Sequence, residues 1–321
     1  MFKKISNIKL FIIFIILLSI LIVVSIIDNK KGGRSFKENL IENDTSEFTR
    51  IEIVSNINGN EAILEKFNDS WFLLDNGKKY STDKAKINII LGYLTKLKPT
   101  GVVSDQKKSW GEYNVTDTSG TIIKLFVKRK KVSEIIIGRS EYNAPKDPTG
   151  YFYVKDATMS FKTFIRPVKD RRVYTISALL SLSFSDNKDE FRNHIVSRID
   201  PGDLVKISFS YPADSSFILN KKNEKWYLND LLIDSLNISK YLNTLKKIDH
   251  FKYVSDLPVG DPELKIILEG DNIVQPIELS AFDVNNQQVV NSSLNPDAYF
   301  DGKESDLFSK IFIGKEELIK E

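Results

Sequence analysis

The chain has 321 residues, of which 41% are hydrophobic, 11% aromatic and 28% charged, a composition typical of globular proteins long enough for two domains. It contains no cysteine, which excludes disulfides, thiolate metal sites and cysteine nucleophiles. The net charge is +3, and Lys3, Lys4 and Lys9 alone equal this excess, so the body that follows is neutral overall. A neutral body lacks the concentrated basic face on which nucleic-acid binding depends, so we expect no nucleic-acid partner.

The first apolar segment, Leu10–Ile27, reads LFIIFIILLSILIVVSII and has eighteen uncharged residues. As a helix it would be roughly 27 Å long, close to the hydrocarbon thickness of a thin bilayer. The alternative is a cleaved signal peptide, whose apolar region is usually only about 7–15 residues long and ends at a small-residue site. No such site follows here. We therefore expect a cationic tail at residues 1–9, a transmembrane anchor at 10–27 and a polar juxtamembrane linker at 28–46.

The orientation of this anchor is less clearly encoded. Positive charges flank it on both sides, so the positive-inside rule does not by itself discriminate between the two orientations. A short cationic tail before the first hydrophobic segment usually stays in the cytoplasm. We therefore expect a single-pass anchor that binds the lipid bilayer and holds the body outside the cytoplasm.

The body contains one sequence pattern twice. The segment ILEKFNDSWFLL at Ile63–Leu74 aligns with FILNKKNEKWYLN at Phe217–Asn229, so that Trp71 matches Trp226. Further along, INIILGYLTKL aligns with ISKYLNTLKKI, and VVSD aligns with YVSD. The order of the matching segments is the same in both halves, which indicates two tandem copies of one unit.

Each copy predicts an α+β unit. Short β-prone runs separated by Asn-Gly or Asn-Asp turns come first, and a segment with helical spacing follows. In the first copy Ser81, Thr82 and Asp83 are available to cap that helix, and Pro99 stops it. The apolar positions of the two helical segments are Ile87, Ile90, Leu91, Leu94 and Leu97, and Ile238, Tyr241, Leu242, Leu245 and Ile248.

These patterns predict an N-terminal transmembrane helix followed by two tandem α+β repeats. Each repeat is expected to be a mainly antiparallel sheet with an amphipathic helix packed on it. The first covers residues 47–180 and the second 201–321. The connector at 181–200 is expected to contain a helix around Asp189–Arg198.

Several of these motifs resemble the domain of unknown function 4340 family. They are W-x-L, a polar loop, an amphipathic helix, VVSD, W-x-x-Y at Trp110–Tyr113 and the connector DEFRNHIVSRIDPGDLVKI. YPADSSF and SSLNPDAYF are similar to elements of its Bacteroidetes members, and the resemblance extends from about Arg50 to Ile319. It implies a bacterial inner-membrane protein with a periplasmic body, often encoded near a gliding-motility-type ABC transporter, so a transporter subunit is the expected partner. The family has no catalytic residues to carry over.

Residues for catalysis or metal binding are not grouped in recognisable motifs. His194 and His250 lie outside any metal-binding pattern, and both are interpreted as structural. Ser-x-x-Lys occurs at Ser81, Ser104 and Ser185 without the partner motifs that its catalytic use requires. We therefore expect no catalytic residue, no metal and no cofactor.

The aromatic residues have two interpretations. Trp71 and Trp226 occupy matching positions, and matching large residues in a repeated unit are expected in the core. Aromatic runs in a strand can also present one face outward, where partners bind. On this basis the weak partner-contact candidates are Tyr151, Tyr153, Tyr299 and Phe300.

The leading functional hypothesis is a membrane-anchored envelope scaffold or accessory protein without catalytic activity, associated with an ABC transporter. Confinement to the membrane raises the effective concentration near another membrane protein, so a weak interface suffices. The first alternative is an envelope glycan- or peptide-binding module. The second is an unrecognised hydrolase that uses carboxylates, for which a concave pocket with convergent Asp or Glu residues is expected.

Overall fold

The computed structural model describes residues 7–30, 36–55, 59–143, 160–181, 183–185, 187–255 and 257–319. The architecture is α+β, with two large antiparallel sheets and short helices, so the predicted fold class is confirmed at this level. Spatial proximity divides the chain into two compact units, which are Met1–Glu61 with Ile89–Asp186 and Ala62–Asn88 with Asn187–Glu321.

The described helices and strands follow in chain order. The α-helices are α1 (Asn7–Lys30), α2 (Lys84–Thr95), α3 (Ser235–Lys246), α4 (Leu307–Ile311) and α5 (Lys315–Ile319), and the 3₁₀ helices are η1 (Thr45–Glu47), η2 (Lys107–Ser109), η3 (Lys188–Phe191) and η4 (Glu304–Asp306). The earlier strands are β1 (Arg50–Ser55), β2 (Glu61–Phe67), β3 (Ser70–Asp75), β4 (Lys78–Ser81), β5 (Gly101–Ser104), β6 (Thr121–Val127), β7 (Lys130–Asn143), β8 (Ser160–Pro167) and β9 (Val173–Ile176). The later strands are β10 (Ile195–Arg198), β11 (Leu204–Ser210), β12 (Phe217–Lys222), β13 (Lys225–Leu228), β14 (Leu231–Leu232), β15 (Lys247–Asp249), β16 (Leu264–Gly270), β17 (Ile277–Val284), β18 (Gln287–Ser292) and β19 (Asn295–Asp301).

The N-terminal apolar run is part of helix α1. The side chains described in this helix belong to residues 12–24, and all of them are exposed. Over the residues covered by the structure, no helix combines the length and the hydropathy that crossing a bilayer requires.

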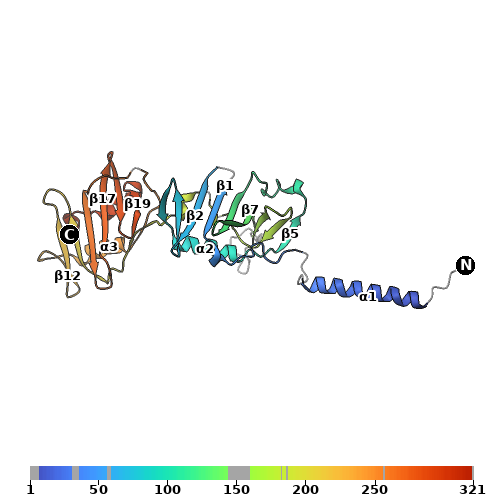
Figure 1. Cartoon of the computed structure of the whole chain (residues 1–321). Coiled ribbons are helices and arrows are strands. Elements are labelled where there is room, and N and C mark those ends of the chain that lie inside the picture. Colours follow the sequence, from blue (N-terminus) through green and yellow to red (C-terminus); the bar gives the residue numbers. More distant parts are fainter. Residues whose placement is uncertain are drawn as a thin grey trace, which may run out of the picture. The chain divides into compact units, whose positions relative to one another are not determined.

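The two large sheets follow the same strand order through most of their width. The nine-stranded sheet runs β4-β3-β2-β1-β6-β7-β8-β9-β5, and the eight-stranded sheet runs β14-β13-β12-β11-β16-β17-β18-β19 (Figure 1). In both sheets four consecutive strands precede the helix, β1–β4 before α2 and β11–β14 before α3. Four later strands, β6–β9 and β16–β19, continue each sheet on the other side of β1 and β11. Strands β10 and β15 form a separate antiparallel pair.

The hairpins of the two sheets also share their register. Lys66 lies opposite Trp71 in β2–β3, and Lys221 lies opposite Trp226 in β12–β13. A two-residue turn closes each hairpin, and both of its residues have positive φ, a conformation that matches the twist of the strands. The turn residues are Asn68, Asp69, Asn223 and Glu224.

Both amphipathic helices form where the spacing predicts them, and an aspartate caps each one. The carboxylate of Asp83 accepts hydrogen bonds from the backbone N–H groups two and three residues on, at 2.8 and 3.3 Å. The carboxylate of Asp234 accepts the corresponding pair at 2.8 and 3.0 Å. These bonds satisfy donors that have no partner inside a helix, so both helices begin at the same place relative to the preceding strand.

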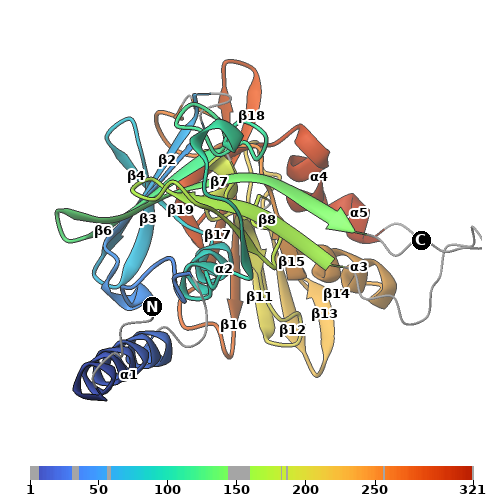
Figure 2. The ribbon, with the colours of Figure 1, turned by 90° about the vertical axis from the view of Figure 1, so that its right-hand side faces the viewer.

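The core of the second unit lies between its sheet and its helices. The buried residues of α3 are Ile238, Tyr241, Leu242 and Leu245, and they pack with strand residues such as Leu219 and with α4 and α5 (Figure 2). The hydroxyl of Tyr241 donates to the carbonyl oxygen of Ile311 at 2.8 Å, which joins α3 to α4. Burial raises the pKa of Tyr241, so this hydroxyl keeps its proton and remains a donor.

The helix predicted around Asp189–Arg198 is wrong. Residues 188–191 form the short 3₁₀ helix η3, and Ile195–Arg198 form strand β10, which pairs with β15. The hydroxyl of Ser197 also donates to the carbonyl oxygen of Leu245 at 2.6 Å. The β-branched pair Ile195-Val196 favours an extended chain once a partner strand is present, and that partner lies some fifty residues further along the sequence.

Substitution of two adjacent residues of β12 compares how much each face of the sheet contributes to the free energy of unfolding. Leu219 is fully buried in the core, whereas the side chain of Ile218 points to the other face and is 41% exposed. We expect Leu219→Ala to lower the free energy of unfolding by about 2–5 kcal/mol, because it leaves a cavity. The matched variant Ile218→Ala should cost about 1 kcal/mol or less. Urea denaturation measures both, and equal losses would contradict this assignment of faces.

Candidate functional site

Strands β2 and β3 carry apolar side chains on both faces. Successive residues of a strand point to opposite sides of the sheet. Leu64 and Leu73 point into the core and have no exposed surface. Ile63, Phe67 and Leu74 point the other way and are only half-buried. The strands of a sheet with one solvated face normally alternate apolar with polar residues. Strands β2 and β3 depart from this pattern, because their second face is also apolar.

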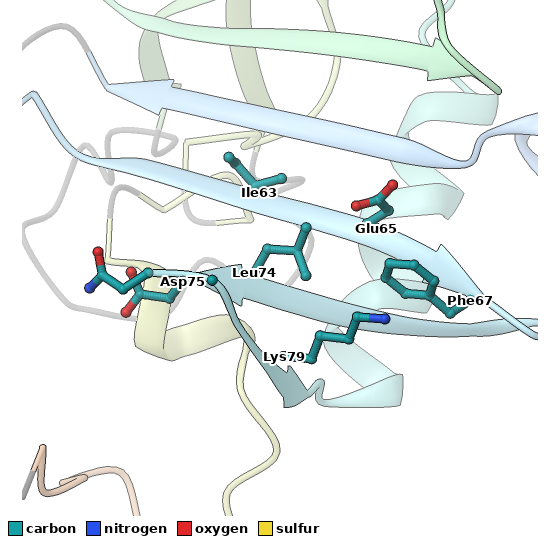
Figure 3. Close-up of a pocket in the computed structure, with 8 residues that line it drawn as sticks. Ile63, Glu65, Phe67, Leu74, Asp75 and Lys79 are labelled. Atoms are coloured by element: carbon teal, nitrogen blue, oxygen red, sulfur yellow. The ribbon is translucent and has the colours of Figure 1, made fainter.

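The second face forms an open depression of about 520 Å³, lined by residues of β2–β4 and the turn between β3 and β4 (Figure 3). The ammonium group of Lys79 lies 3.4 Å from the centroid of the Phe67 ring, and Phe72 packs edge-on against the same ring at 5.9 Å. Glu65 and Asp75 place carboxylates beside these apolar side chains. Asp75 forms an ion pair with Lys188 at 2.7 Å.

The corresponding face of the eight-stranded sheet is more polar. The shared register matches Phe67 with Lys222 and Glu65 with Asn220. The sequence alignment matches Leu74 with Asn229, which follows β13. The remaining matches are Ile63 with Ile218 and Phe72 with Tyr227. Asn229 follows the end of β13 and has positive φ, whereas Lys222 lies within β12. The fold therefore forms with lysine at the position of Phe67 and does not require an aromatic side chain there.

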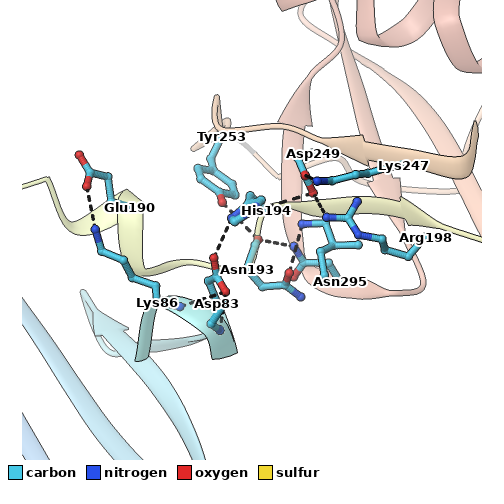
Figure 4. Close-up of polar contacts among 12 residues, drawn as sticks. Asp83, Lys86, Glu190, Asn193, His194, Arg198, Lys247, Asp249, Tyr253 and Asn295 are labelled. Carbon is cyan, nitrogen blue, oxygen red and sulfur yellow. Dashed lines mark hydrogen bonds and ion pairs between the residues drawn. The ribbon is translucent and has the colours of Figure 1, made fainter. Parts of the chain in front are cut away.

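A second cluster of side chains surrounds His194, also within the second unit (Figure 4). Its Nδ1 lies 3.6 Å from a carboxylate oxygen of Asp83, and its Nε2 lies 3.9 Å from a carboxylate oxygen of Asp249. The ring stacks on Phe251 with centroids 4.4 Å apart. The guanidinium group of Arg198 binds the same carboxylate of Asp249 at 2.5 Å.

The backbone around this cluster continues the edge of β4. The N–H of Asn193 donates to the carbonyl oxygen of Ser81 at 2.7 Å, and the N–H of Asp83 donates to the carbonyl oxygen of Phe191 at 3.0 Å. Thr82 and Arg192 form the antiparallel bridge between these two bonds. Residues 191–193, which directly follow the 3₁₀ helix η3, therefore bond to the outer side of the chain at the end of β4 through a single antiparallel bridge.

Side chains hold the same segment in place. The guanidinium carbon of Arg192 lies 4.1 Å from the ring centroid of Tyr80 and 3.7 Å from that of Tyr253. Lys86 binds Glu190 at 3.3 Å. The Nε atom of Arg192 has no hydrogen-bond partner among the described residues. We call this cluster the clasp, because its contacts join β4 and α2 to the segment that leads into β10.

His250 follows the clasp in sequence and is buried, with 5% of its surface exposed. Its backbone N–H donates to the carbonyl oxygen of His194 at 2.8 Å, and its ring meets Phe300 edge-on. The Nε2 atom has no hydrogen-bond partner among the described residues. Burial lowers the pKa of His250, against the opposing effect of the carboxylates of Asp301 and Glu304. Its ordinary state is therefore the neutral imidazole.

The four aromatic candidates from the sequence do not form one surface. Tyr151 and Tyr153 lie outside the described residues. Tyr299 is half-buried in β19, and its role as a partner contact stays a prediction. The proposal of Phe300 as a contact is wrong, because its side chain has no exposed surface and packs against Tyr253 at 5.2 Å. A ring in the core cannot meet a partner without local unfolding.

The two tryptophans also differ in their burial. Trp226 is 6% exposed and belongs to the core, as predicted. Trp71 is only half-buried, although its position in the hairpin is the same. The carbonyl oxygen of Trp71 accepts a hydrogen bond from the hydroxyl of Thr82 at 2.8 Å, and the carbonyl oxygen of Trp226 accepts one from the backbone N–H of Ile233 at 3.0 Å.

Sequence reasoning missed both the depression and the clasp. The signal for the depression is the pair of runs ILEKF and WFLL, which are apolar on both faces rather than alternating. The clasp joins residues about one hundred positions apart, and no local pattern indicates that contact. In the described ranges, no group of three or more His, Asp or Glu side chains could hold a metal ion.

Comparison with known proteins gives one match. The family described as domain of unknown function (DUF4340) matches residues 71–265 of the 321-residue chain. This span begins in β3 and ends in β16, so it includes α2, α3 and the clasp. No curated protein and no solved structure matches the chain.

The buried imidazole predicts a pH dependence of stability. Because the pKa of His250 is lower in the folded chain than its ordinary value of about 6.5, the unfolded chain takes up the proton first as the pH falls. The contribution of the neutral imidazole to the free energy of unfolding is therefore complete above about pH 6.5. It is lost as the pH falls toward the pKa of His250 in the folded chain. We expect His250→Gln to reduce the loss of stability between pH 7.5 and 5.5.

Thermal or urea unfolding at several pH values measures this difference. His194→Gln is the matched control, because it removes the only other imidazole of the chain. If the free energy of unfolding falls equally with pH in the wild type and in His250→Gln, a group other than His250 takes up the proton.

Proposed function

The chain belongs to the DUF4340 family, and we propose that it is a membrane-anchored envelope protein that acts as a scaffold or accessory subunit without catalytic activity. Its body binds another membrane protein, for which a subunit of a gliding-motility-type ABC transporter is the proposed candidate. The two sheets are proposed to be tandem copies of one unit that have taken different roles.

The observation that carries this proposal is the depression on β2–β4. Phe67 and Leu74 are half-exposed there, while the matched positions of the other sheet hold Lys222 and Asn229. Exposed apolar surface that the fold does not require has a cost in solubility, and such surface marks interaction sites. The depression is open and lies on the face of a sheet, a shape that suits a protein surface.

The arrangement of charges favours a protein partner over a glycan. Sugar rings stack on the free face of an aromatic side chain, but the ammonium group of Lys79 lies over the Phe67 ring at 3.4 Å. One face of this ring is therefore already in use. Glu65 lies beside the apolar side chains, where it can receive a basic side chain of a partner.

Attachment to the membrane is proposed from the sequence. The uncharged run Leu10–Ile27 extends at both ends beyond the side chains described in α1. A helix of this length satisfies its own backbone hydrogen bonds in lipid. Anchoring confines the body near other membrane proteins, so a modest apolar surface suffices for binding.

The absence of cysteine allows a direct test of location, because a single introduced thiol is the only one in the chain. We expect a membrane-impermeant maleimide to label Val274→Cys in intact spheroplasts, since Val274 is 98% exposed and the body faces the periplasm. Lys4→Cys is the control at the other end of the anchor and should react only after permeabilisation. Protection of Val274→Cys would place the body in the cytoplasm, and release of the chain by alkaline carbonate would exclude an anchor.

A second prediction concerns the partner. We expect full-length protein from gently solubilised membranes to retain a transporter subunit, identified by mass spectrometry. The double variant Phe67→Lys with Leu74→Asn replaces two residues of the depression with those at the aligned positions of the second copy. We expect it to lower the recovery of the transporter subunit about tenfold. Recovery should be unchanged when an unrelated anchor replaces Leu10–Ile27, because the contact lies in the body.

The matched control for this variant is Ile218→Ala with Tyr227→Ala, on the equivalent face of the eight-stranded sheet. Equal recovery with the grafted depression would remove the depression from the interface. Recovery only with the native anchor would place the contact in the membrane instead.

A further inference from the structure

The edge of β4 and the edge of β14 are equivalent but are not covered alike. Ser81 lies opposite Phe72 in the first sheet, and Leu232 lies opposite Tyr227 in the second. The residues that cap the following helices, Asp83 and Asp234, come two positions later in each case. The structure therefore contains the same strand edge twice, next to the same helix start.

The first of these edges is occupied by the chain itself. Directly after the 3₁₀ helix η3, the N–H of Asn193 donates to the carbonyl oxygen of Ser81, and the carbonyl oxygen of Phe191 accepts from the N–H of Asp83. The guanidinium group of Arg192 lies over the ring of Tyr80. Ser81 and Tyr80 are half-buried as a result. This arrangement protects an edge strand, whose unpaired backbone groups otherwise attract other chains.

The second edge has no such cover among the described residues. Leu231 and Leu232 are each 52% exposed, and Leu236 in the first turn of α3 is 75% exposed. Asp234 is exposed where Asp83 is half-buried, and its backbone N–H makes no hydrogen bond within the described chain. Three neighbouring leucines at an edge strand are unusual, because edges are normally protected by charges or by a covering segment.

We propose that the β14 edge is the docking site for an extended segment of a partner protein, which bonds to the eight-stranded sheet as residues 191–193 bond to the end of β4. This strand pairs antiparallel with β14 and accepts a hydrogen bond from the N–H of Asp234. It donates another to the carbonyl oxygen of Leu232. Backbone bonds of this kind supply affinity, and side chains on alternate positions supply specificity.

The internal template also defines the side chains of this partner strand. Arg192 lies over Tyr80, and the residue of β14 equivalent to Tyr80 is Leu231. We therefore expect the partner strand to have an apolar side chain at the position that corresponds to Arg192. Where Glu190 pairs with Lys86, the equivalent residue is Asn237, which suits an uncharged side chain. Where His194 lies beside Asp83, the equivalent carboxylate is Asp234, which suits a basic side chain.

Charge argues against a second copy of the chain as the occupant. Antiparallel pairing of β14 with itself would place Asp230 and Asp234 of one copy near the same residues of the other. Like charges across an interface oppose association. A strand with an apolar centre and a basic end complements this edge.

The test uses the full-length protein in detergent and a fluorescein-labelled peptide as the probe. The peptide has the sequence of residues 188–196 with Glu190→Gln and Arg192→Leu, which adapts the internal strand to the β14 edge. We expect saturable binding by fluorescence anisotropy. The control peptide carries His194→Glu as well and should bind at least about tenfold more weakly, because it places two carboxylates together.

Variants of the protein locate this binding. Leu231→Lys with Leu232→Lys should weaken peptide binding at least about tenfold. Both side chains are half-exposed, so the fold should persist, and circular dichroism checks this. Asp234→Asn retains a good helix cap but removes the charge, and should weaken binding about threefold. Ile218→Lys is the matched control, an exposed apolar residue of β12 away from the edge, and should leave binding unchanged.

Absence of saturable binding, or binding unaffected by the double lysine variant, would overturn the proposal. Light scattering of the same samples reports the oligomeric state. A wild-type dimer that the double lysine variant converts to a monomer would also overturn it, because a second copy would then occupy the edge. The depression on β2–β4 is a separate surface and is tested with separate variants. Failure of the peptide to bind the β14 edge therefore leaves the proposed function of the depression intact, and the reverse also holds.

Discussion

The pairing of residues 191–193 with the end of β4 is the constraint on which much of the second unit depends. Two backbone hydrogen bonds, one at Ser81 and one at Asp83, fix a chain segment that is about one hundred residues distant in sequence. Because an edge strand carries unpaired donors and acceptors, such a segment both stabilises the sheet and blocks other pairings. The same segment leads into β10 and carries His194, which lies between two carboxylates and whose carbonyl oxygen accepts from the N–H of His250. The clasp is therefore structural, and its polar residues are used in holding the chain.

The two large sheets share one strand order but present surfaces of different chemistry. The fold places a hairpin, an edge strand and a capped helix in the same arrangement in both sheets. On the first, the outer face is apolar and the edge is covered, whereas on the second the outer face is more polar and the edge bears exposed leucines. Each feature that differs is one that the common fold does not need. Differences of this kind point to function, because selection for the fold alone would not separate them.

Both surfaces are suited to macromolecular partners, since neither encloses a small ligand. An open apolar face with one carboxylate and an uncovered strand edge recognise a partner through shape, backbone bonds and a few charges. Such interfaces are individually modest. A membrane anchor would compensate for this, because it keeps the body close to its partner and raises their effective concentration. The proposed scaffold function thus follows from two weak surfaces acting together.

Local sequence determined the α+β class, the two amphipathic helices, the group of residues that contains the cap of the first helix and the matching hairpins, because all of these depend on spacing within a dozen residues. It also placed Trp226 in the core. Tertiary structure decided the rest. It turned Ile195–Arg198 into a strand by supplying β15 as a partner, buried Phe300 against Tyr253, and left Trp71 half-exposed. The depression and the uncovered edge depend on which faces and edges remain free after long-range pairing, and the period of a single strand does not contain that information.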